Sequence, residues 1–239
     1  MIEMRVFRWK RDQEPRYDHF LLPYGPRTTV LDLLEVIRVD HDPGLVYRHS
    51  CHHGACGTCA MRINGVERLA CLTCVADLLK EESRVIVEPL NGFPLLGDLV
   101  VEMTPFNERL AAVGLPPLRR CELPGEPPEG GAVQLEDCIE CGACVSACPV
   151  AVTDHHYLGP AALNAIWRAV EEPRGLDVEP LLDMADGEHG CWRCHAVFEC
   201  SEVCPNQTGP AEAIMRLRQR LFIRRLRQLL RGGDGHGRA

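Results

Sequence analysis

Cysteines dominate the chemistry that this sequence of 239 residues can support, because it contains 14 of them. Most fall into three groups whose short spacings suit several thiolates binding one metal centre. The sequence opens with no charged and apolar leader that would predict export. Without export, such a cysteine content favours metal ligands over disulfide bonds. We therefore expect metal chemistry built on thiolates.

The first group begins in the stretch CHHGACGTC. Three of its cysteines have the C-x4-C-x2-C spacing of plant-type [2Fe-2S] ferredoxins, and a fourth follows downstream. The four predicted ligands are Cys51, Cys56, Cys59 and Cys71. The Asn64-Gly65 pair predicts a tight hairpin turn about midway between the last two cysteines. Closing this hairpin would bring their sulfurs together.

Glycines and histidines shape the same loop. We expect Gly54 and Gly57 to let the loop wrap tightly and to aim backbone N–H groups at cluster sulfurs. His52 and His53, between the first two ligands, either shift the cluster's potential or are exposed bystanders. A structural zinc site is the alternative for the four cysteines, although zinc sites usually combine pairs of C-x2-C.

The second group, CIECGACVSACP, matches the bacterial run C-x2-C-x2-C-x3-C-P in full. The third, CHAVFECSEVCP, repeats this run but holds Val197 at the second ligand position. In ferredoxins with two such runs, the fourth cysteine of each run ligates the cluster of the other. This rule predicts a [4Fe-4S] cluster on Cys138, Cys141, Cys144 and Cys204.

The same rule leaves three thiolates for the remaining cluster. They are Cys148, Cys194 and Cys200. Because valine cannot bind metal, the fourth iron has no protein ligand and is readily lost, which predicts [3Fe-4S]. A buried valine beside a [4Fe-4S] cluster with a non-cysteine ligand is the alternative. The cysteines outside the three sets are expected to be buried or idle thiols; they are Cys74, Cys121 and Cys191.

An α+β fold in two parts would position these groups. Residues 1–114 show strand-like alternation around one helix near residues 29–39, which Thr28 or Thr29 can cap. This part is predicted to be a plant-type ferredoxin (β-grasp) domain that holds [2Fe-2S]. Residues 115–137 are rich in proline, glycine and charge, which predicts a linker.

The second part, residues 138–239, is predicted to be an all-helical domain like a bacterial ferredoxin, holding [4Fe-4S] and [3Fe-4S]. One helix is expected to begin at Pro160, and a last helix to run from about Pro210 to about Leu230. Residues 216–231 contain seven arginines and no acid.

Within this basic segment, Leu217, Leu221 and Phe222 are expected to form an apolar stripe. Such a helix suits docking against anionic lipid or an anchor subunit. The alternative is a solvated basic tail, and the residues after it are predicted to be disordered.

Composition argues against other classes of protein. The chain is 46% hydrophobic and 25% charged, as in ordinary soluble globular proteins. No apolar run approaches the roughly 18 residues of a membrane span. The formal net charge of −8 argues against a nucleic-acid partner.

Three clusters in this order resemble the iron-sulfur subunit of succinate dehydrogenase and fumarate reductase, respiratory complex II. EPLNGFPLLGDLVVEM resembles the segment that joins the two domains of that family, and LGPAAL resembles a helix start after the second cysteine run. The resemblance covers roughly residues 4 to 220. It implies a subunit that conducts electrons from the covalent FAD of a partner flavoprotein, through [2Fe-2S], [4Fe-4S] and [3Fe-4S], to a quinone.

The resemblance also implies an enzyme complex, succinate dehydrogenase, in which this subunit has no catalytic residue of its own. The complex would lie on the cytoplasmic face of the cell membrane, held by anchor subunits with or without haem. His195 and Pro149 match the quinone vicinity, although a partly exposed histidine bonded to backbone is the alternative for His195. Thr153 stands where ubiquinone-linked members carry tryptophan, which favours menaquinone.

Several alternatives share these cysteine patterns. A quinol:fumarate reductase running in reverse would use the same clusters, and so would a related dehydrogenase with another substrate. Thiol-linked members usually continue into a further cysteine-rich domain, whereas this sequence ends about 35 residues after Cys204. A zinc-stabilised binding protein and a free soluble ferredoxin are the remaining alternatives.

Overall fold

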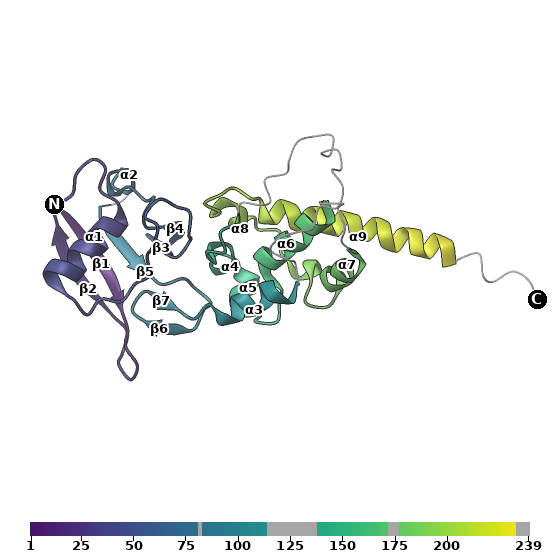
Figure 1. Cartoon of the computed structure of the whole chain (residues 1–239), viewed down its shortest axis with the longest axis horizontal. Helices are drawn as coiled ribbons and strands as arrows, with labels where there is room; N and C mark the ends of the chain where they lie inside the picture. The colour runs from purple at the N-terminus through teal and green to yellow at the C-terminus, as the bar shows by residue number, and fades with distance from the viewer. Residues whose placement is uncertain (81–82, 114–137, 172–176, 233–239) are drawn as a thin grey trace, which may run out of the picture.

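The computed structural model describes residues 1–80, 83–113, 138–171 and 177–232. The predicted linker at 115–137, with Cys121, and the last seven residues of the predicted disordered tail lie outside this described part. Strands gather at one end of the elongated molecule and helices at the other, with the last helix extending beyond its neighbours (Figure 1). None of the described helices is both long enough and apolar enough to cross a membrane.

The N-terminal part is a five-stranded mixed sheet in the order β2-β1-β5-β3-β4. β1 pairs antiparallel with β2 and parallel with β5, while β3 pairs antiparallel with both β4 and β5. The strands are β1 (Ile2–Arg8), β2 (Arg16–Leu22), β3 (Ala60–Ile63), β4 (Val66–Leu69) and β5 (Val85–Glu88). Side chains alternate along β1 between buried and partly buried, because successive residues of a strand face opposite sides.

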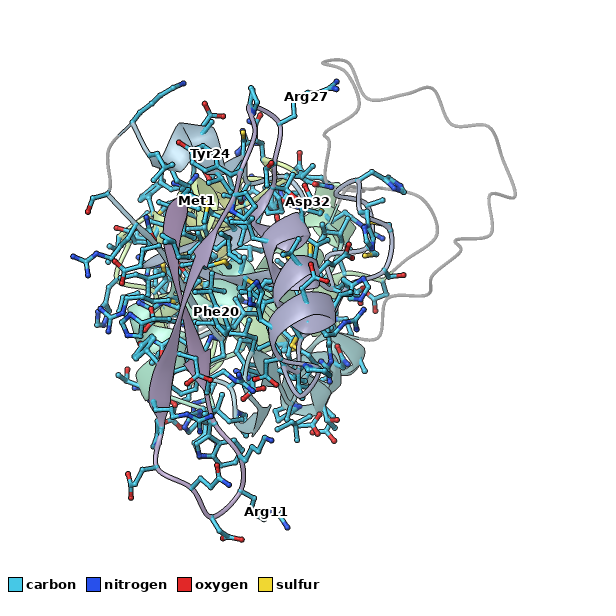
Figure 2. The ribbon with its side chains drawn as sticks, turned by 90° about the vertical axis from the view of Figure 1, so that its left-hand side faces the viewer. Met1, Arg11, Phe20, Tyr24, Arg27 and Asp32 are labelled. Carbon is cyan, nitrogen blue, oxygen red and sulfur yellow. The ribbon has the colours of Figure 1, made fainter. Side chains whose placement is uncertain are left out.

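Helix α1 (Val30–Val36) lies alongside β1 and β2 (Figure 2) and continues as a π-helical turn at Ile37–His41. Thr29 caps it as predicted: its hydroxyl accepts from the Asp32 N–H at 3.1 Å, and Asp32 accepts from the Thr29 N–H at 2.8 Å. Such a reciprocal cap satisfies two backbone donors at the helix start. The apolar side chains of this helix, Val30, Leu33 and Leu34, are buried in one core with the sheet.

Short elements whose bounds the sequence did not predict complete the N-terminal part and lead to the second. The short helix α2 (Val75–Leu78) lies within the N-terminal part, between the hairpin of β3 and β4 and strand β5. The strands β6 (Leu95–Gly97) and β7 (Val100–Val101) form a separate antiparallel pair, and α3 (Thr104–Ala112) follows them.

The C-terminal part is helical, so the predicted α+β architecture is confirmed. Its helices are α4 (Ala143–Ser146), α5 (Pro149–Thr153), α6 (Gly159–Glu171), α7 (Glu179–Asp186), α8 (Glu199–Glu202) and α9 (Pro210–Gly232), with a 3-10 turn at Cys191–Arg193. α6 and α9 pack together through a core that includes Leu163, Ile166 and Leu217. The helix expected from Pro160 and the last helix expected from Pro210 are both confirmed.

One part of the predicted stripe on the last helix is wrong. Leu217 and Leu221 are buried in the core, but Phe222 is 62% exposed. Four residues return a helix to the same face, whereas one residue turns it by about 100°. Phe222 therefore leaves the face that Leu217 and Leu221 share.

The basic segment is also less free than its composition suggests. Arg224 contacts Glu179 and Asp183 at 2.8 and 2.7 Å. Arg225 pairs with Asp186 at 2.7 Å. Acids of α7 thus neutralise part of the charge of α9, so this part of the helix is not a solvated basic tail.

Candidate metal centres

The first cysteine group is organised by the hairpin of β3 and β4. Asn64 and Gly65 have φ values of 50° and 78°, as a tight turn of this type requires. The Ala70 N–H donates to the Cys59 carbonyl at 3.1 Å, so the cysteines at either end of the hairpin meet at its open end. The hairpin predicted from the sequence is confirmed.

The loop before the hairpin wraps around a sulfur. The N–H groups of Ala55 and Cys56 both donate to the Cys51 sulfur at 3.3 Å. Gly54 and Gly57 have φ values of 80° and 70°, which side chains with a Cβ adopt only with strain. The predicted role of these two glycines in turning the loop is confirmed.

The cysteines of this group differ in how readily their thiols lose a proton. Backbone hydrogen bonds, first from His53 and then from Cys56, lower the pKa of Cys51 to about 6. Burial raises the pKa of Cys59 to about 12, and the neighbouring Cys71 sulfur adds to the shift. A buried thiol becomes a thiolate readily only when a cation replaces its proton.

The second group surrounds a cavity at the start of the helical part. Four sulfur-bearing residues line it, and these are Cys138, Cys141, Cys144 and Cys204. Burial raises the pKa of Cys141 to about 11 and that of Cys144 well above its ordinary value. The Thr208 N–H donates to the Cys204 sulfur at 3.4 Å. The last cysteine of the later run therefore lies with the first three cysteines of the earlier run.

The third group contains three sulfurs. Cys148 caps α5, Cys194 follows the 3-10 turn, and Cys200 lies in α8. Burial raises the pKa of Cys200 to about 12, and the nearby Cys148 and Cys194 sulfurs add to this. The Ala196 N–H donates to the Cys194 sulfur at 3.3 Å.

Tyr157 lies beside this third group, which the sequence analysis did not predict. Its side chain is fully buried, and its hydroxyl has no hydrogen-bond partner among the described residues. Burial and then the sulfurs of Cys194, Cys148 and Cys200 raise its pKa. A buried donor without a partner is costly, so its position beside three sulfurs fits an acceptor such as a cluster sulfide.

Arg218 of α9 is a second residue that the sequence did not reveal. It donates to the carbonyls of Cys191 at 2.9 Å and Trp192 at 3.2 Å, and also to that of Cys194. One guanidinium thereby holds the segment that leads into the third group. Arg218 is one of seven arginines in residues 216–231, so the sequence does not distinguish it from the others.

Around the third group, the loop between Cys194 and α8 faces outward. Val197 is 51% exposed, so the burial of valine expected in the [4Fe-4S] alternative is not observed. His195 and Pro149 are also exposed. Exposed apolar side chains also gather here, where the family resemblance implies the quinone end; they include Trp192, Val197 and Phe198.

The unassigned cysteines behave largely as predicted. Cys191 is fully buried, and burial raises its pKa to about 11. Cys74 is partly buried and donates its S–H to the Pro26 carbonyl at 3.3 Å. Neither joins one of the three groups. All three groups fit iron-sulfur clusters, because each combines crowded thiols, most of them partly or fully buried, with an N–H donor aimed at sulfur.

Comparison with known proteins agrees with these sites. Residues 3–108 match the family described as a 2Fe-2S iron-sulfur cluster binding domain, and residues 134–208 match the 4Fe-4S dicluster domain. The fumarate reductase iron-sulfur subunit of Mycobacterium tuberculosis is 36% identical over 239 residues, covering 96% of both chains. The succinate dehydrogenase iron-sulfur subunit of Coxiella burnetii is 34% identical, covering 81% of this chain and 83% of its own.

A solved structure shares the whole architecture. A chain of the Mycobacterium smegmatis Sdh1 complex in the apo form superposes with a TM-score of 0.78 at 26% identity, covering 93% of this chain and 96% of its own. Fold, cysteine groups and relatives agree over nearly the full length. The chain therefore belongs to the family of iron-sulfur subunits of succinate dehydrogenase and fumarate reductase.

Proposed function

We propose that this subunit passes electrons, one at a time, from the FAD of a partner flavoprotein to a membrane quinone in a succinate dehydrogenase complex. The observation that carries the proposal is spatial: the first cysteine group lies next to the second, and the second lies next to the third. A Cβ on Gly57, in the first loop, would lie 2.8 Å from the Cβ of Cys141 in the second group. Cys200 of the third group lies close enough to Cys144 of the second to contribute to its raised pKa, after burial and the neighbouring Cys141 and Cys138.

The number of thiolates in each group decides which cluster we assign to it. We assign [2Fe-2S] to the first four cysteines, [4Fe-4S] to the second four and [3Fe-4S] to the last three. When bound, these clusters supply one-electron redox chemistry. The chain fixes the thiolates, donates N–H groups to sulfur and keeps Cys59, Cys71 and Cys200 buried.

At the far end, we assign the quinone vicinity to His195 and Pro149 beside the third group. The exposed apolar loop there offers a surface for an anchor subunit and for the quinone ring. Thr153 donates its hydroxyl to the Pro149 carbonyl at 2.8 Å, so this small residue lies next to the same surface. A small side chain in place of tryptophan supports menaquinone as the partner.

The last helix supports a peripheral position on the cytoplasmic face of the membrane. Its outer half exposes apolar residues at i, i+4, i+7 and i+8, which share one face of a helix; they are Phe222, Leu226, Leu229 and Leu230. Further arginines flank this stripe. Such a face suits anchor subunits, with or without haem, beside anionic lipid headgroups.

Purification of the native complex tests the proposal. A flavoprotein with bound FAD should copurify, and the iron and acid-labile sulfide contents should equal the sum of the three clusters. Addition of succinate should bleach the brown colour, and quinone should restore it. Full clusters that succinate leaves oxidised would contradict the substrate. If reduced quinone together with fumarate turned over far faster than succinate with quinone, the complex would work as a fumarate reductase.

A further inference from the structure

Three side chains outside the cysteine groups converge beside the first loop. Glu35 lies on α1, while His49 and His52 lie in the segment that leads into and follows Cys51. His49 Nδ1 and His52 Nε2 are 2.9 Å apart, and the Glu35 carboxylate lies 3.7 Å from the former and 3.6 Å from the latter. Their side chains are 34%, 23% and 44% exposed, so solvent reaches all three.

These separations match those around a tetrahedral metal ion. Zinc binds imidazole nitrogen at about 2.0–2.1 Å and carboxylate oxygen at about 2.0–2.2 Å. In tetrahedral geometry, such bonds place any two donor atoms about 3.3–3.5 Å apart. The three observed separations lie on either side of that range, so a cation could enter with only small movements of the side chains.

The backbone and an aromatic neighbour favour this arrangement. His52 has a φ of 64°, which is uncommon for residues other than glycine and disfavoured by local sterics. The His49 ring stacks on the buried Tyr47 ring, with centroids 5.2 Å apart and an interplanar angle of 28°. Strained conformations of this kind concentrate at functional sites.

We propose that Glu35, His49 and His52 form a binding site for a divalent cation of the zinc class, separate from the cysteine groups. Two imidazoles and one carboxylate are a ligand set that zinc uses when a fourth position stays open. Two nitrogen donors out of three disfavour Mg²⁺ and Ca²⁺, which prefer oxygen. The fourth position is open to water or to a group of a partner subunit.

The site has a consequence for the first loop, and this consequence rests on the proposed [2Fe-2S] cluster. His52 is bonded directly to Cys51 along the chain. A cation held there adds positive charge next to the cluster's ligand, which favours the reduced, more negative cluster. Zinc would therefore raise the potential of [2Fe-2S].

The test counts bound zinc in the purified complex. Wild type and the variants Glu35→Gln, His49→Gln and His52→Gln are equilibrated with micromolar ZnCl₂ by dialysis, and zinc and iron are measured by mass spectrometry. Wild type should hold one more zinc than each variant, with affinity at least about tenfold higher, since even losing a partner of a metal ligand costs that much. His19→Gln is the matched control, because exposed His19 contacts one carboxylate among the described residues, that of Glu3 at 3.0 Å.

Equal zinc in wild type and all three variants, at unchanged iron content, would overturn the site. A second measurement covers a variant that fails to fold. Zinc-edge X-ray absorption on the wild-type complex should show nitrogen and oxygen neighbours at about 2.0–2.1 Å. Sulfur neighbours at about 2.3 Å would instead show zinc in a cysteine group and contradict the proposal.

The electrostatic consequence has its own readout. In redox titrations followed by EPR, zinc should shift the [2Fe-2S] midpoint upward in wild type and leave it in place in His52→Gln. If bound zinc left the [2Fe-2S] midpoint potential of wild type unchanged, this consequence would be overturned. Absence of the [2Fe-2S] signal from the reduced complex without added zinc would instead contradict the proposed clusters, while the zinc count still tests the site.

Discussion

At the scale of single residues, the predicted type of the third cluster depends on one valine, Val197. The sequence alone was enough for this prediction, because a missing ligand in a spaced motif is visible without a structure. Its exposure was not predictable, since it depends on how the loop from Cys194 to α8 folds. Val197 is half-exposed, so a larger or polar side chain fits there without disturbing the core.

Val197→Cys should convert the three-iron cluster to [4Fe-4S], because it restores the missing thiolate. We expect a lower potential and slower quinone reduction, since the added thiolate makes the site more negative. The readout is EPR of the oxidised complex, in which the signal of the three-iron cluster should vanish. Val197→Ala is the matched control and should keep that signal. An unchanged spectrum in Val197→Cys would contradict the ligand assignment.

Tyr157→Phe tests the buried hydroxyl beside the third group. If this hydroxyl donates to cluster sulfur, its removal should lower the [3Fe-4S] potential, because hydrogen bonds to sulfur stabilise the reduced cluster. Potentiometric EPR measures the shift. Tyr47→Phe is the control, because it removes another buried hydroxyl without a partner among the described residues, near the first loop. Equal [3Fe-4S] potentials in both variants would refute the role of Tyr157.

At the scale of elements, local patterns were reliable and long-range contacts were not. The hairpin at Asn64-Gly65, the cap at Thr29 and the start of α9 all depend on neighbouring residues, so their patterns can be read directly. The contacts of Arg218 with the segment that leads into the third group join residues that are 24 to 27 apart in sequence. Nothing in a run of arginines distinguishes the one that folds inward.

Arg218→Ala should loosen the segment that carries Cys194. Three carbonyls lose a charged donor, and each such hydrogen bond contributes about 1.5–3 kcal/mol where it is shielded from water. We expect a lower melting temperature and faster loss of the three-iron EPR signal in air. Arg220→Ala changes an exposed arginine of the same helix and should leave both unchanged. Similar behaviour of the two variants would show that the Arg218 contacts contribute little.

At the scale of the whole molecule, function depends on how closely the two parts meet. Buried Glu67 of β4 accepts a hydrogen bond of 2.7 Å from Ser146 of α4, whose hydroxyl in turn accepts from the Asn91 N–H at 2.7 Å. Gly57 packs against Cys141 and against the Ile139 carbonyl. Sequence reasoning predicted two parts but not this interface, because its residues are individually unremarkable.

Gly57→Ala should push the first and second groups apart. Its new Cβ would lie 2.8 Å from the Cys141 Cβ and 2.9 Å from the Ile139 carbonyl oxygen, and its φ of 70° adds about 1–2 kcal/mol of backbone strain. We expect a lower melting temperature and a weaker magnetic interaction between the reduced clusters. Gly65→Ala is the matched control, since its φ is 78° but no atom lies within 4 Å of its new Cβ. Equal losses in both variants would mean that strain alone acts, without the clash at the interface.

The central claim is a path of three clusters that receives electrons from succinate and ends in a three-iron cluster. Low-temperature EPR of the native complex, first as isolated and then after addition of succinate, tests it most directly. The account predicts a sharp, nearly isotropic signal in the oxidised sample, which succinate removes as a [2Fe-2S] signal emerges. An oxidised sample without any signal would contradict the assignment of three thiolates to the last cluster.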